Sequence, residues 1–205
     1  MKTIVIIGAS GSGKSRIEKE LYKYYGCKKI VSYTTREPRP GEVNGKDYWF
    51  ITNGRFEEML NLNLLAEYDE YSQGRKYGTL KDDYQDFADG NRVVVLTPNG
   101  LRQIKKTLNE KDIFVVLVQA SLGTRIKRYI DRIGANNFTY DDKNEIASRV
   151  ERDYSMFLGT EREANLIIQN EDGCDISVIG KQIIEAIGDW YEEKDIFSRS
   201  YGMLW

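Results

Sequence analysis

Histidine is absent from this 205-residue sequence, so histidine-based catalytic triads and histidine metal sites are excluded. Cysteine is nearly absent: the chain has only Cys27 and Cys174, and two cysteines imply no disulfide framework. No apolar run approaches the roughly 20 residues that a membrane-spanning helix needs. The N-terminal apolar stretch is too short for a signal peptide and leads straight into a glycine-rich turn. We therefore expect a cytoplasmic protein with no membrane partner.

A charge excess of either sign is also lacking. The 30 lysines and arginines nearly balance the 32 aspartates and glutamates, which gives a formal net charge of -2. A chain so balanced has no global basic surface for DNA or RNA, so we expect no nucleic-acid partner and only local anion sites. With 3 prolines and 40% hydrophobic residues, the composition is that of an ordinary globular domain, with room for small inserted lobes.

The segment GASGSGKS, residues 8–15, follows the apolar run TIVII of residues 3–7. Its pattern is G-x-x-x-x-G-K-[ST], and the residues after it have helical spacing, with Ile17 and Leu21 on one face. A strand, a glycine turn and a helix are the context that this phosphate-binding motif requires. The backbone N–H groups of such a turn and the positive end of the helix favour phosphate. A flexible glycine–serine loop is the alternative interpretation.

This motif assigns roles to individual residues. Lys14 is expected to reach the β- and γ-phosphates of a nucleotide, and the Ser15 hydroxyl is expected to coordinate Mg²⁺. The remaining phosphate contacts are expected from the turn itself: Gly8, Ala9, Ser10, Gly11, Ser12 and Gly13.

Strand-like apolar runs alternate with helical patterns along most of the chain. Strands are expected at 3–7, 92–97, 112–120 and 164–170, and helices at 15–25, 98–109, 121–133, 143–158 and 175–193. Buried strands that alternate with helices indicate a parallel α/β sheet. Residues 134–142 lack periodicity and are expected to form a mobile loop. The tail from Glu192 has a periodicity that fits no element.

Residues 32–79 have a different character. They combine turn signals, a strand pattern in YWFIT, a short helical pattern in GRFEEMLNLN and alternation in LLAEYDEY, so we expect a small mixed lobe inserted after the second strand of the sheet. The lobe begins with Arg36, Arg39, Lys46 and Tyr48 in a turn-rich stretch. Arginine suits bidentate phosphate contacts, so this stretch suggests a second anion site. An exposed basic turn is the alternative.

The stretch SYTTREPRPGEVNGKDYWF at 32–50, together with the phosphate-binding motif, resembles the guanylate kinase family. The resemblance extends over roughly residues 3–190, and this stretch is far more specific than the glycine motif alone. The resemblance implies that Arg128, Arg132 and Arg149 close over ATP and act in catalysis together with Lys14. It also implies that Asn170 lies near the adenine. It implies that GMP is bound by Ser32, Arg36, Arg39, Tyr48, Glu67, Tyr77, Gly78 and Thr79.

Glu67 has the chemistry to select guanine. One carboxylate can accept hydrogen bonds from both the N1–H and the N2 amine of guanine, and the edge of adenine offers no such pair. The Thr79 hydroxyl can donate to the O6 of guanine. The alternatives are a surface glutamate in a run with Asp69 and Glu70, and an ordinary strand threonine.

Four other candidates have structural alternatives. Tyr48 and Tyr77 fit equally well as core aromatics of the lobe. Arg128 and Arg132 are four residues apart on a predicted helix, where like charges repel mildly. That repulsion favours an anion between them, although a solvated helix face is the commoner outcome.

The sequence departs from the family at one strand end. The family's D-x-D pattern falls on Val95 and Thr97 when the chains are aligned on Gly100, so the first acid is lost and a hydroxyl replaces the second. A carboxylate near Mg²⁺ and the acceptor is therefore expected to be missing. The turn SQGRKYG at 72–78 is one residue longer than usual, and the stretch 132–146 is longer than the family's lid.

Together these features predict an α/β P-loop kinase with a parallel five-stranded sheet flanked by helices, an inserted mixed α/β GMP-binding lobe and a helical lid. The expected core covers 1–31 and 91–205, with the lid at about 125–155 and the GMP-binding lobe at 32–90. The implied reaction transfers the γ-phosphoryl group of ATP to GMP, giving ADP and GDP, in a monomer or homodimer. The alternatives are a kinase for a related (deoxy)nucleotide or a phosphosugar, and a non-catalytic guanylate-kinase-like module that binds protein ligands.

Overall fold

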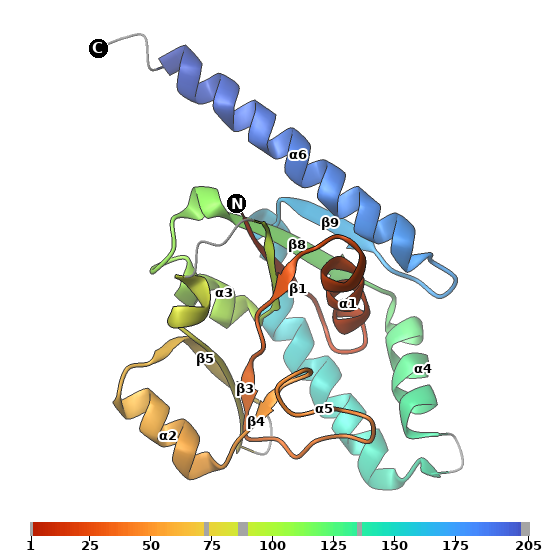
Figure 1. The fold of residues 1–205 in the computed structure, drawn as a ribbon. Coiled ribbons are helices and arrows are strands. Elements are labelled where there is room, and N and C mark those ends of the chain that lie inside the picture. Colours follow the sequence, from red (N-terminus) through yellow and green to blue (C-terminus); the bar gives the residue numbers. More distant parts are fainter. Residues whose placement is uncertain (1, 72–73, 86–89, 135–136, 202–205) are drawn as a thin grey trace.

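Two β-sheets organise the chain, and helices pack around them (Figure 1). The computed structural model describes residues 2–71, 74–85, 90–134 and 137–201. Five strands form the first sheet and four strands form the second. The α/β class predicted from the sequence is confirmed.

The five-stranded sheet is parallel throughout. Its strands, in spatial order, are β2 (Lys28–Lys29), β7 (Arg92–Val95), β1 (Thr3–Ile7), β8 (Ile113–Gln119) and β9 (Leu166–Gln169). The central strand β1 is buried along its whole length, as expected for a strand that is covered on both faces. All carboxyl ends of the strands meet at one edge of the sheet, which is where ligands bind in folds of this class.

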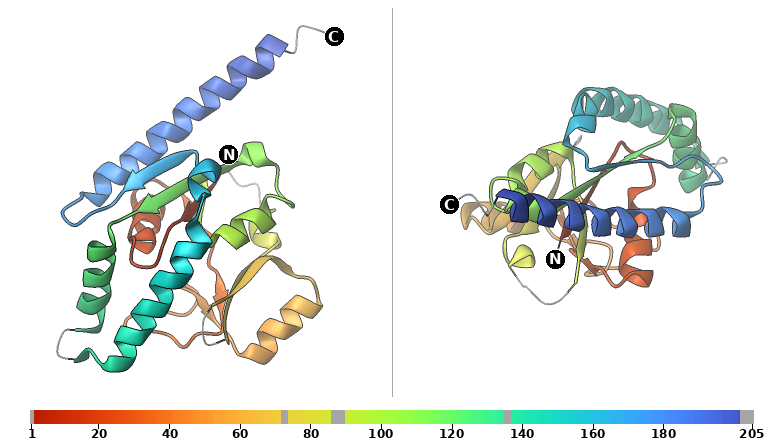
Figure 2. Two further views of the ribbon diagram at one scale, coloured as in Figure 1. Left: turned by 180° about the vertical axis from the view of Figure 1, so that it is seen from behind. Right: turned by 90° about the horizontal axis from the view of Figure 1, so that it is seen from above.

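Helices cover both faces of this sheet (Figure 2). They are α1 (Lys14–Tyr24), α3 (Pro98–Ile104), α5 (Tyr140–Phe157), which contributes Phe157, and α6 (Ile176–Tyr201). The helix α4 (Leu122–Ile133) follows β8 and lies beyond the carboxyl end of that strand (Figure 1). Alternate residues of β1 face opposite sides, so Ile4 and Ile6 pack in the cluster that includes α1 and α6. Val5 and Ile7 pack in the second cluster, which includes residues of α3.

The second sheet is mixed and all of its strands lie within residues 33–80. In spatial order they are β4 (Trp49–Phe50), β3 (Tyr33–Thr34), β6 (Arg75–Leu80) and β5 (Leu65–Tyr71). The helix α2 (Asn53–Asn61) covers it, and Phe56 and Met59 of α2 pack with Leu65 of β5 in a small core of their own. These elements lie within the expected GMP-binding lobe. Residues 72–73, where the predicted long turn begins, and residues 86–89 lie outside the described part of the chain.

Short 3-10 segments complete the described secondary structure. They are η2 (Asp82–Tyr84), η3 (Glu110–Asp112) and η5 (Thr160–Glu163).

The helix α5 begins earlier than the sequence pattern suggests. Thr139 caps it: its hydroxyl accepts a hydrogen bond from the Asp142 N–H at 3.2 Å, and the Asp142 carboxylate accepts one from the Thr139 N–H at 2.9 Å. This reciprocal capping box fixes the helix start at Tyr140. The expectation of a loop over 134–142 is therefore wrong for 140–142, and residues 135–136 lie outside the described part.

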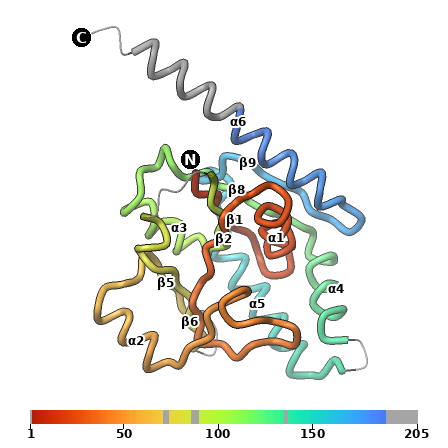
Figure 3. Tube along the Cα trace, viewed as in Figure 1, coloured from red at the N-terminus to blue at the C-terminus, as the bar shows by residue number. Residues whose placement is uncertain are grey.

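The last helix, α6, continues beyond the predicted end at residue 193 to Tyr201. Its first part runs beside β9 and α1 (Figure 3). The predicted tail from Glu192 is thus helical over its described residues, and 202–205 lie outside them. Within the described helices, none combines the length and the apolar character that crossing a membrane requires.

Candidate active site

The phosphate loop, defined here as residues 8–13, joins β1 to α1 at the carboxyl edge of the parallel sheet. Gly13 caps α1 with a φ of 97°, a left-handed conformation that glycine adopts without strain. A Cβ at Gly13 would collide with the amide of Asn170, and one at Gly8 would collide with the carbonyl of Val118. The two glycines therefore let the loop pass close to β8 and to the end of β9.

Lys14 folds back over this loop. Its Nζ donates hydrogen bonds to the carbonyl oxygens of Gly8 at 2.6 Å and Ala9 at 3.1 Å. Burial lowers the pKa of Lys14 to about 8, with Arg125 and Arg149 acting in the same direction and the Asp153 carboxylate opposing them. The ammonium group thus lies near the cations Arg125 and Arg149 and the carboxylate of Asp153.

Two further side chains hold the outer carbonyl groups of the loop. Arg128 of α4 donates to the carbonyls of Gly11 and Ser12, both at 3.3 Å. Asn170, only 2% exposed, donates to the Ser12 carbonyl at 2.7 Å. The first N–H groups of a helix precede its own hydrogen-bond ladder, which in α1 begins where the Arg16 N–H donates to the Gly13 carbonyl at 3.0 Å, so the start of α1 suits an anion. In this structure Asn170 supports the loop from behind, and its predicted contact with adenine remains a prediction.

A cavity of about 590 Å³ lies between the phosphate loop, the second sheet and the pair α4–α5. Its wall combines most of the residues proposed from the sequence: Ser10, Gly11, Gly13, Lys14, Ser15, Ser32, Arg36, Arg39, Tyr48, Glu67, Tyr77, Arg128, Arg132 and Arg149. Residues proposed for the donor and for the acceptor therefore share one space.

Six proposed residues lie outside this wall: Gly8, Ala9, Ser12, Gly78, Thr79 and Asn170. The first three belong to the phosphate loop. Gly78 lies behind the wall, where a Cβ would be within 2.8 Å of the Glu67 carbonyl. Thr79 is fully buried, and its proposed contact with O6 of guanine remains a prediction.

Cationic side chains dominate the wall. The basic residues are Lys14, Arg16, Arg36, Arg39, Arg75, Arg128, Arg132 and Arg149, and the acidic ones are Glu67, Asp69, Asp131 and Asp172. Although the chain as a whole is slightly acidic, the cavity carries a local excess of positive charge. Such an excess attracts polyanions.

Glu67 on β5 is the buried acid of the cavity, and only 4% of it is exposed. The Thr79 hydroxyl donates to Glu67 Oε1 at 2.9 Å and lies 2.9 Å from the Tyr84 hydroxyl. Burial, with a contribution from the neighbouring Asp69, raises the pKa of Glu67 to about 7, although the Thr79 hydrogen bond lowers it. Thr79 therefore orients Glu67.

A second carboxylate stands beside Glu67. Asp69 lies two residues along β5, on the same face of the strand, and its Oδ2 accepts a hydrogen bond of 2.6 Å from the Thr97 hydroxyl. Asp69 and Thr97 both line the cavity. The sequence predicts a missing carboxylate at the end of β7, but here Asp69 reaches this place from the second sheet.

The arginine-rich stretch folds as a compact turn. Arg36 forms a bidentate pair with Glu42, at 2.8 and 2.9 Å, and its guanidinium lies 5.3 Å from the centre of the Tyr48 ring. Tyr48 meets Tyr77 edge to face at 5.9 Å. The backbone N–H of Arg39 also donates to Glu42, at 2.7 Å. The bidentate pair with Glu42 thus fixes the position of the Arg36 guanidinium.

Three further arginines line the cavity: Arg39 of the turn-rich stretch, Arg132 of α4 and Arg149 of α5. Burial lowers the pKa of Arg132 on α4, and the positive charges of Arg39 and Arg149 lower it further. Mutual repulsion of this kind is relieved by an anion placed among the three guanidinium groups. This arrangement favours the phosphate-binding alternative over a solvated face for Arg132.

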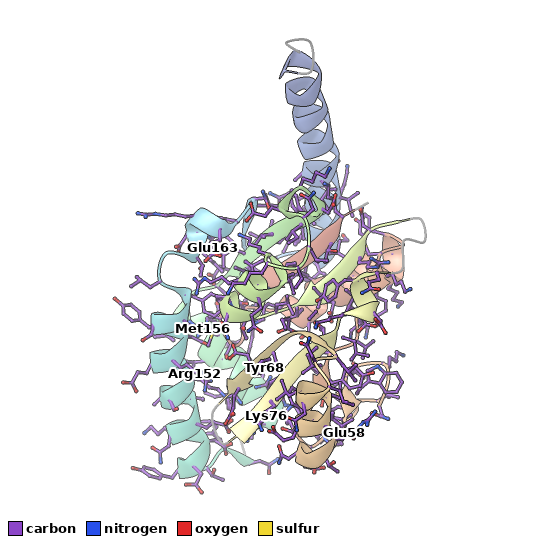
Figure 4. The ribbon with its side chains drawn as sticks, turned by 90° about the vertical axis from the view of Figure 1, so that its left-hand side faces the viewer. Glu58, Tyr68, Lys76, Arg152, Met156 and Glu163 are labelled. Carbon is purple, nitrogen blue, oxygen red and sulfur yellow. The ribbon has the colours of Figure 1, made fainter. Side chains whose placement is uncertain are left out.

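A hydrogen-bonded latch, defined here as Arg75, Glu145 and Arg149, connects the second sheet to α5. Arg75 donates to Glu145 Oε1 at 3.2 Å, and Arg149 donates to the same oxygen at 2.6 and 3.1 Å. In Figure 4, α5, which carries Arg152 and Met156, runs beside the strands that carry Tyr68 and Lys76. The latch closes the cavity along this side.

Several side chains at the cavity are not among the site residues proposed from the sequence. Asp69, Arg75, Asp131 and Asp172 line the cavity, and Glu42 and Glu145 hold its arginines. For Glu42 the signal was present, since it belongs to the same motif as Arg36 and Arg39. Glu145 and Asp131 also have a local signal, because each lies four residues from a basic residue on its helix, Arg149 and Lys127. No sequence spacing marks Asp69, Arg75 or Asp172, because their partners come from distant segments.

Comparison with known proteins agrees with this geometry. A family model described as guanylate kinase matches residues 1–186. A guanylate kinase of Trichormus variabilis is 33% identical over 178 residues, which cover 83% of each chain. The matches to guanylate kinases of Lactobacillus johnsonii and Lactobacillus acidophilus are 37% and 36% identical, over 63% and 59% of this chain. They span 64% and 60% of those relatives' own lengths.

Among solved structures, a guanylate kinase from Anaplasma phagocytophilum has the same fold, with a TM-score of 0.63 at 19% identity. The superposition covers 92% of this chain and 86% of that one. The matched sequence model spans both sheets and the cavity. The chain belongs to the guanylate kinase family.

Proposed function

We propose that this protein transfers the γ-phosphoryl group of ATP to GMP, giving ADP and GDP. One observation carries the proposal: a single cavity joins a phosphate loop at one end to a buried carboxylate, Glu67, at the other. The loop suits the donor phosphates, and Glu67 suits the base of the acceptor. The names of the relatives support the same activity.

The acceptor end of the cavity fits guanine. Glu67 is backed by Thr79, so its carboxylate is held in place to accept from N1–H and the N2 amine. Asp69, held by Thr97, provides further acceptor oxygens beside it. A site that offers two carboxylates rejects a base edge that presents acceptors, because those acceptors stay unpaired.

The phosphate groups fit the cationic part of the wall. Arg39, Tyr48 and the fixed guanidinium of Arg36 line the cavity and would bind the phosphate of GMP. Lys14, Arg132 and Arg149 line it too and would stabilise the phosphoryl group in transit, because that transition state is stabilised by position and charge. The acceptor phosphate is mostly dianionic at neutral pH, since its second pKa is about 6, so no general base is required.

The residues of the cavity also fit Mg²⁺. This ion takes few protein ligands and keeps water and phosphate oxygens around it, so it does not need a cage of acids. In the described part of the chain no cluster of three or more potential ligand residues forms such a cage. Ser15 at the start of α1 lines the cavity and is the proposed protein ligand. When bound, the ion neutralises charge on the phosphates.

Product analysis tests the proposal. With ATP, GMP and Mg²⁺, we expect ADP and GDP to form in equal amounts, and GMP omission to abolish ADP formation. The variant Glu67→Gln is expected to lose this reaction, whereas Glu58→Gln, which changes an exposed glutamate on α2, is expected to keep it. ADP formation that is independent of GMP would contradict the proposal.

A further inference from the structure

Groups from three elements form a ring around Ser10 of the phosphate loop. The Ser10 N–H donates to Asp153 Oδ2 at 2.8 Å, and Arg125 Nε donates to the Ser10 carbonyl at 2.8 Å. Arg125 also donates to the same Asp153 oxygen, at 2.5 Å. Both polar backbone groups of Ser10 are therefore held by side chains. We call Arg125 and Asp153 the strap.

The strap is buried outside the cavity. Asp153 is 2% exposed, the Arg125 side chain is 15% exposed, and neither residue lines the cavity. The second oxygen of Asp153 has no hydrogen-bond partner among the described residues. A carboxylate with one unpaired oxygen is costly to bury. The negative charge of Asp153 also repels an anion that enters the neighbouring phosphate loop. A direct role in binding phosphate therefore does not explain why Asp153 lies there.

The spacing along the two helices supplies that explanation. On α4, Arg125 precedes Arg128 by three residues, and on α5, Asp153 follows Arg149 by four. Residues at these spacings share a helix face. The ring at Ser10 therefore fixes the rotation of both helices relative to the loop. Arg128 and Arg149 face the cavity as a result.

We propose that Arg125 and Asp153 are positioning residues for the donor nucleotide: they fix the phosphate loop and set the two cavity arginines against it. They act through Ser10, Arg128 and Arg149 and do not touch the nucleotide themselves. The inference rests on the proposed function for the identity of that nucleotide.

Calorimetry of ADP and GMP binding tests the strap without relying on turnover. Asp153→Asn and Arg125→Met are each expected to weaken ADP binding about tenfold, since coupled contacts of this kind are worth about one decade. The double variant is expected to bind ADP no more weakly than the worse single variant, because both changes open the same ring. GMP affinity is expected to stay within about twofold. Glu151→Gln removes an exposed carboxylate on α5 and serves as the matched control, with unchanged ADP affinity.

Thermal unfolding of each variant identifies a mere loss of fold. If Asp153→Asn does not fold, Arg125→Lys carries the test, because lysine keeps the charge but cannot bridge Ser10 and Asp153 as a guanidinium does. Wild-type ADP affinity in the folded variants would overturn the proposal, as would equal losses of ADP and GMP affinity. A wild-type protein that binds ADP but no GMP would instead contradict the proposed function and leave the strap intact.

Discussion

The Thr97 hydroxyl donates a hydrogen bond of 2.6 Å to Asp69 and accepts one of 2.9 Å from the Gly100 N–H. It thereby caps α3 and ties the end of β7 to β5 of the second sheet. The strand end lacks the aspartates expected from the family, yet a carboxylate is present there because it comes from another strand. Thr97 is engaged on both sides.

Replacement of this hydroxyl tests its two roles. Thr97→Val keeps the shape but removes the cap, so the free energy of unfolding should fall by about 1 kcal/mol. It also removes the hydrogen bond that holds the charged Asp69 carboxylate, and we expect GMP affinity to fall about tenfold for that reason. Denaturant unfolding and calorimetry measure the two effects. Thr97→Ser, which keeps both bonds, is the control. Wild-type GMP affinity in Thr97→Val would exclude Asp69 from the acceptor site.

Lys14 is expected to serve the donor phosphates only. Lys14→Met should reduce the rate of GDP formation by at least about 100-fold, because a cation at the transferring group is lost. GMP binding, measured by calorimetry, should change by no more than about twofold. A loss of GMP affinity as large as the loss of rate would show that donor and acceptor sites are not separate.

Glu67 predicts a pH dependence of acceptor binding. Its pKa of about 7 means that the carboxylate is largely protonated at pH 6, when it can no longer accept both guanine donors. GMP affinity should therefore rise about tenfold from pH 6 to pH 8, as the ionised fraction does. A flat profile would contradict this assignment.

The phosphate of GMP also titrates, with a second pKa of about 6, so a control is needed. Glu67→Gln retains the phosphate but cannot ionise. The variant should bind GMP weakly and lose the part of the profile near pH 7. In the folded wild type the raised pKa also means that stability decreases as the pH rises from about 4.5 toward 7, since the unfolded chain ionises first.

The latch at Glu145 predicts a stability effect in acid. Burial alone would raise the pKa of Glu145, but hydrogen bonds and charge from Arg149, with Tyr129 and Arg75, lower it to about 2. This stabilisation is complete above about pH 4.5 and is lost as the pH falls toward 2.

Glu145→Gln should therefore be less stable than the wild type near neutral pH, and its unfolding free energy should fall less between pH 4.5 and 2. Glu151→Gln, at an exposed position of the same helix, is the control. Identical slopes for the wild type and Glu145→Gln would mean that the latch does not form in solution.

Local patterns predicted the parts of the fold that local forces determine. The buried run of β1, the glycine loop and α1 follow one another directly in the sequence, and each was placed correctly. Helix ends were less accurate. The predicted helix at 98–109 stops at Ile104, and a turn follows in which the Thr107 hydroxyl and the N–H groups of Thr107 and Leu108 all donate to the Ile104 carbonyl.

The start of α5 was missed for a different reason. Thr139 and Asp142 form a capping box with aspartate in the place where glutamate is usual, so the signal was weaker than the polar composition around it.

For the site, motif residues such as Lys14 and Arg36 were recognisable, but their supporting partners were not. Asp69 meets Thr97 and Arg125 meets Asp153 across 28 residues in each case, and only the fold brings such pairs together. The hydrogen bond from Thr79 to Glu67 could not be predicted from the sequence, because it depends on how β5 and β6 pair; the contact of Thr79 with the base stays a prediction.

The most direct test of the account is a coupled assay of ADP release with ATP and an equal concentration of GMP, dGMP, AMP, CMP or UMP as acceptor. Because Thr79 holds the Glu67 carboxylate in place to accept hydrogen bonds from guanine, kcat/KM should be highest for the guanine nucleotides. It should fall by at least about 1,000-fold for AMP, CMP and UMP, since those bases leave the buried carboxylate unpaired. Comparable values for GMP and AMP, or no ADP release with any acceptor, would contradict it.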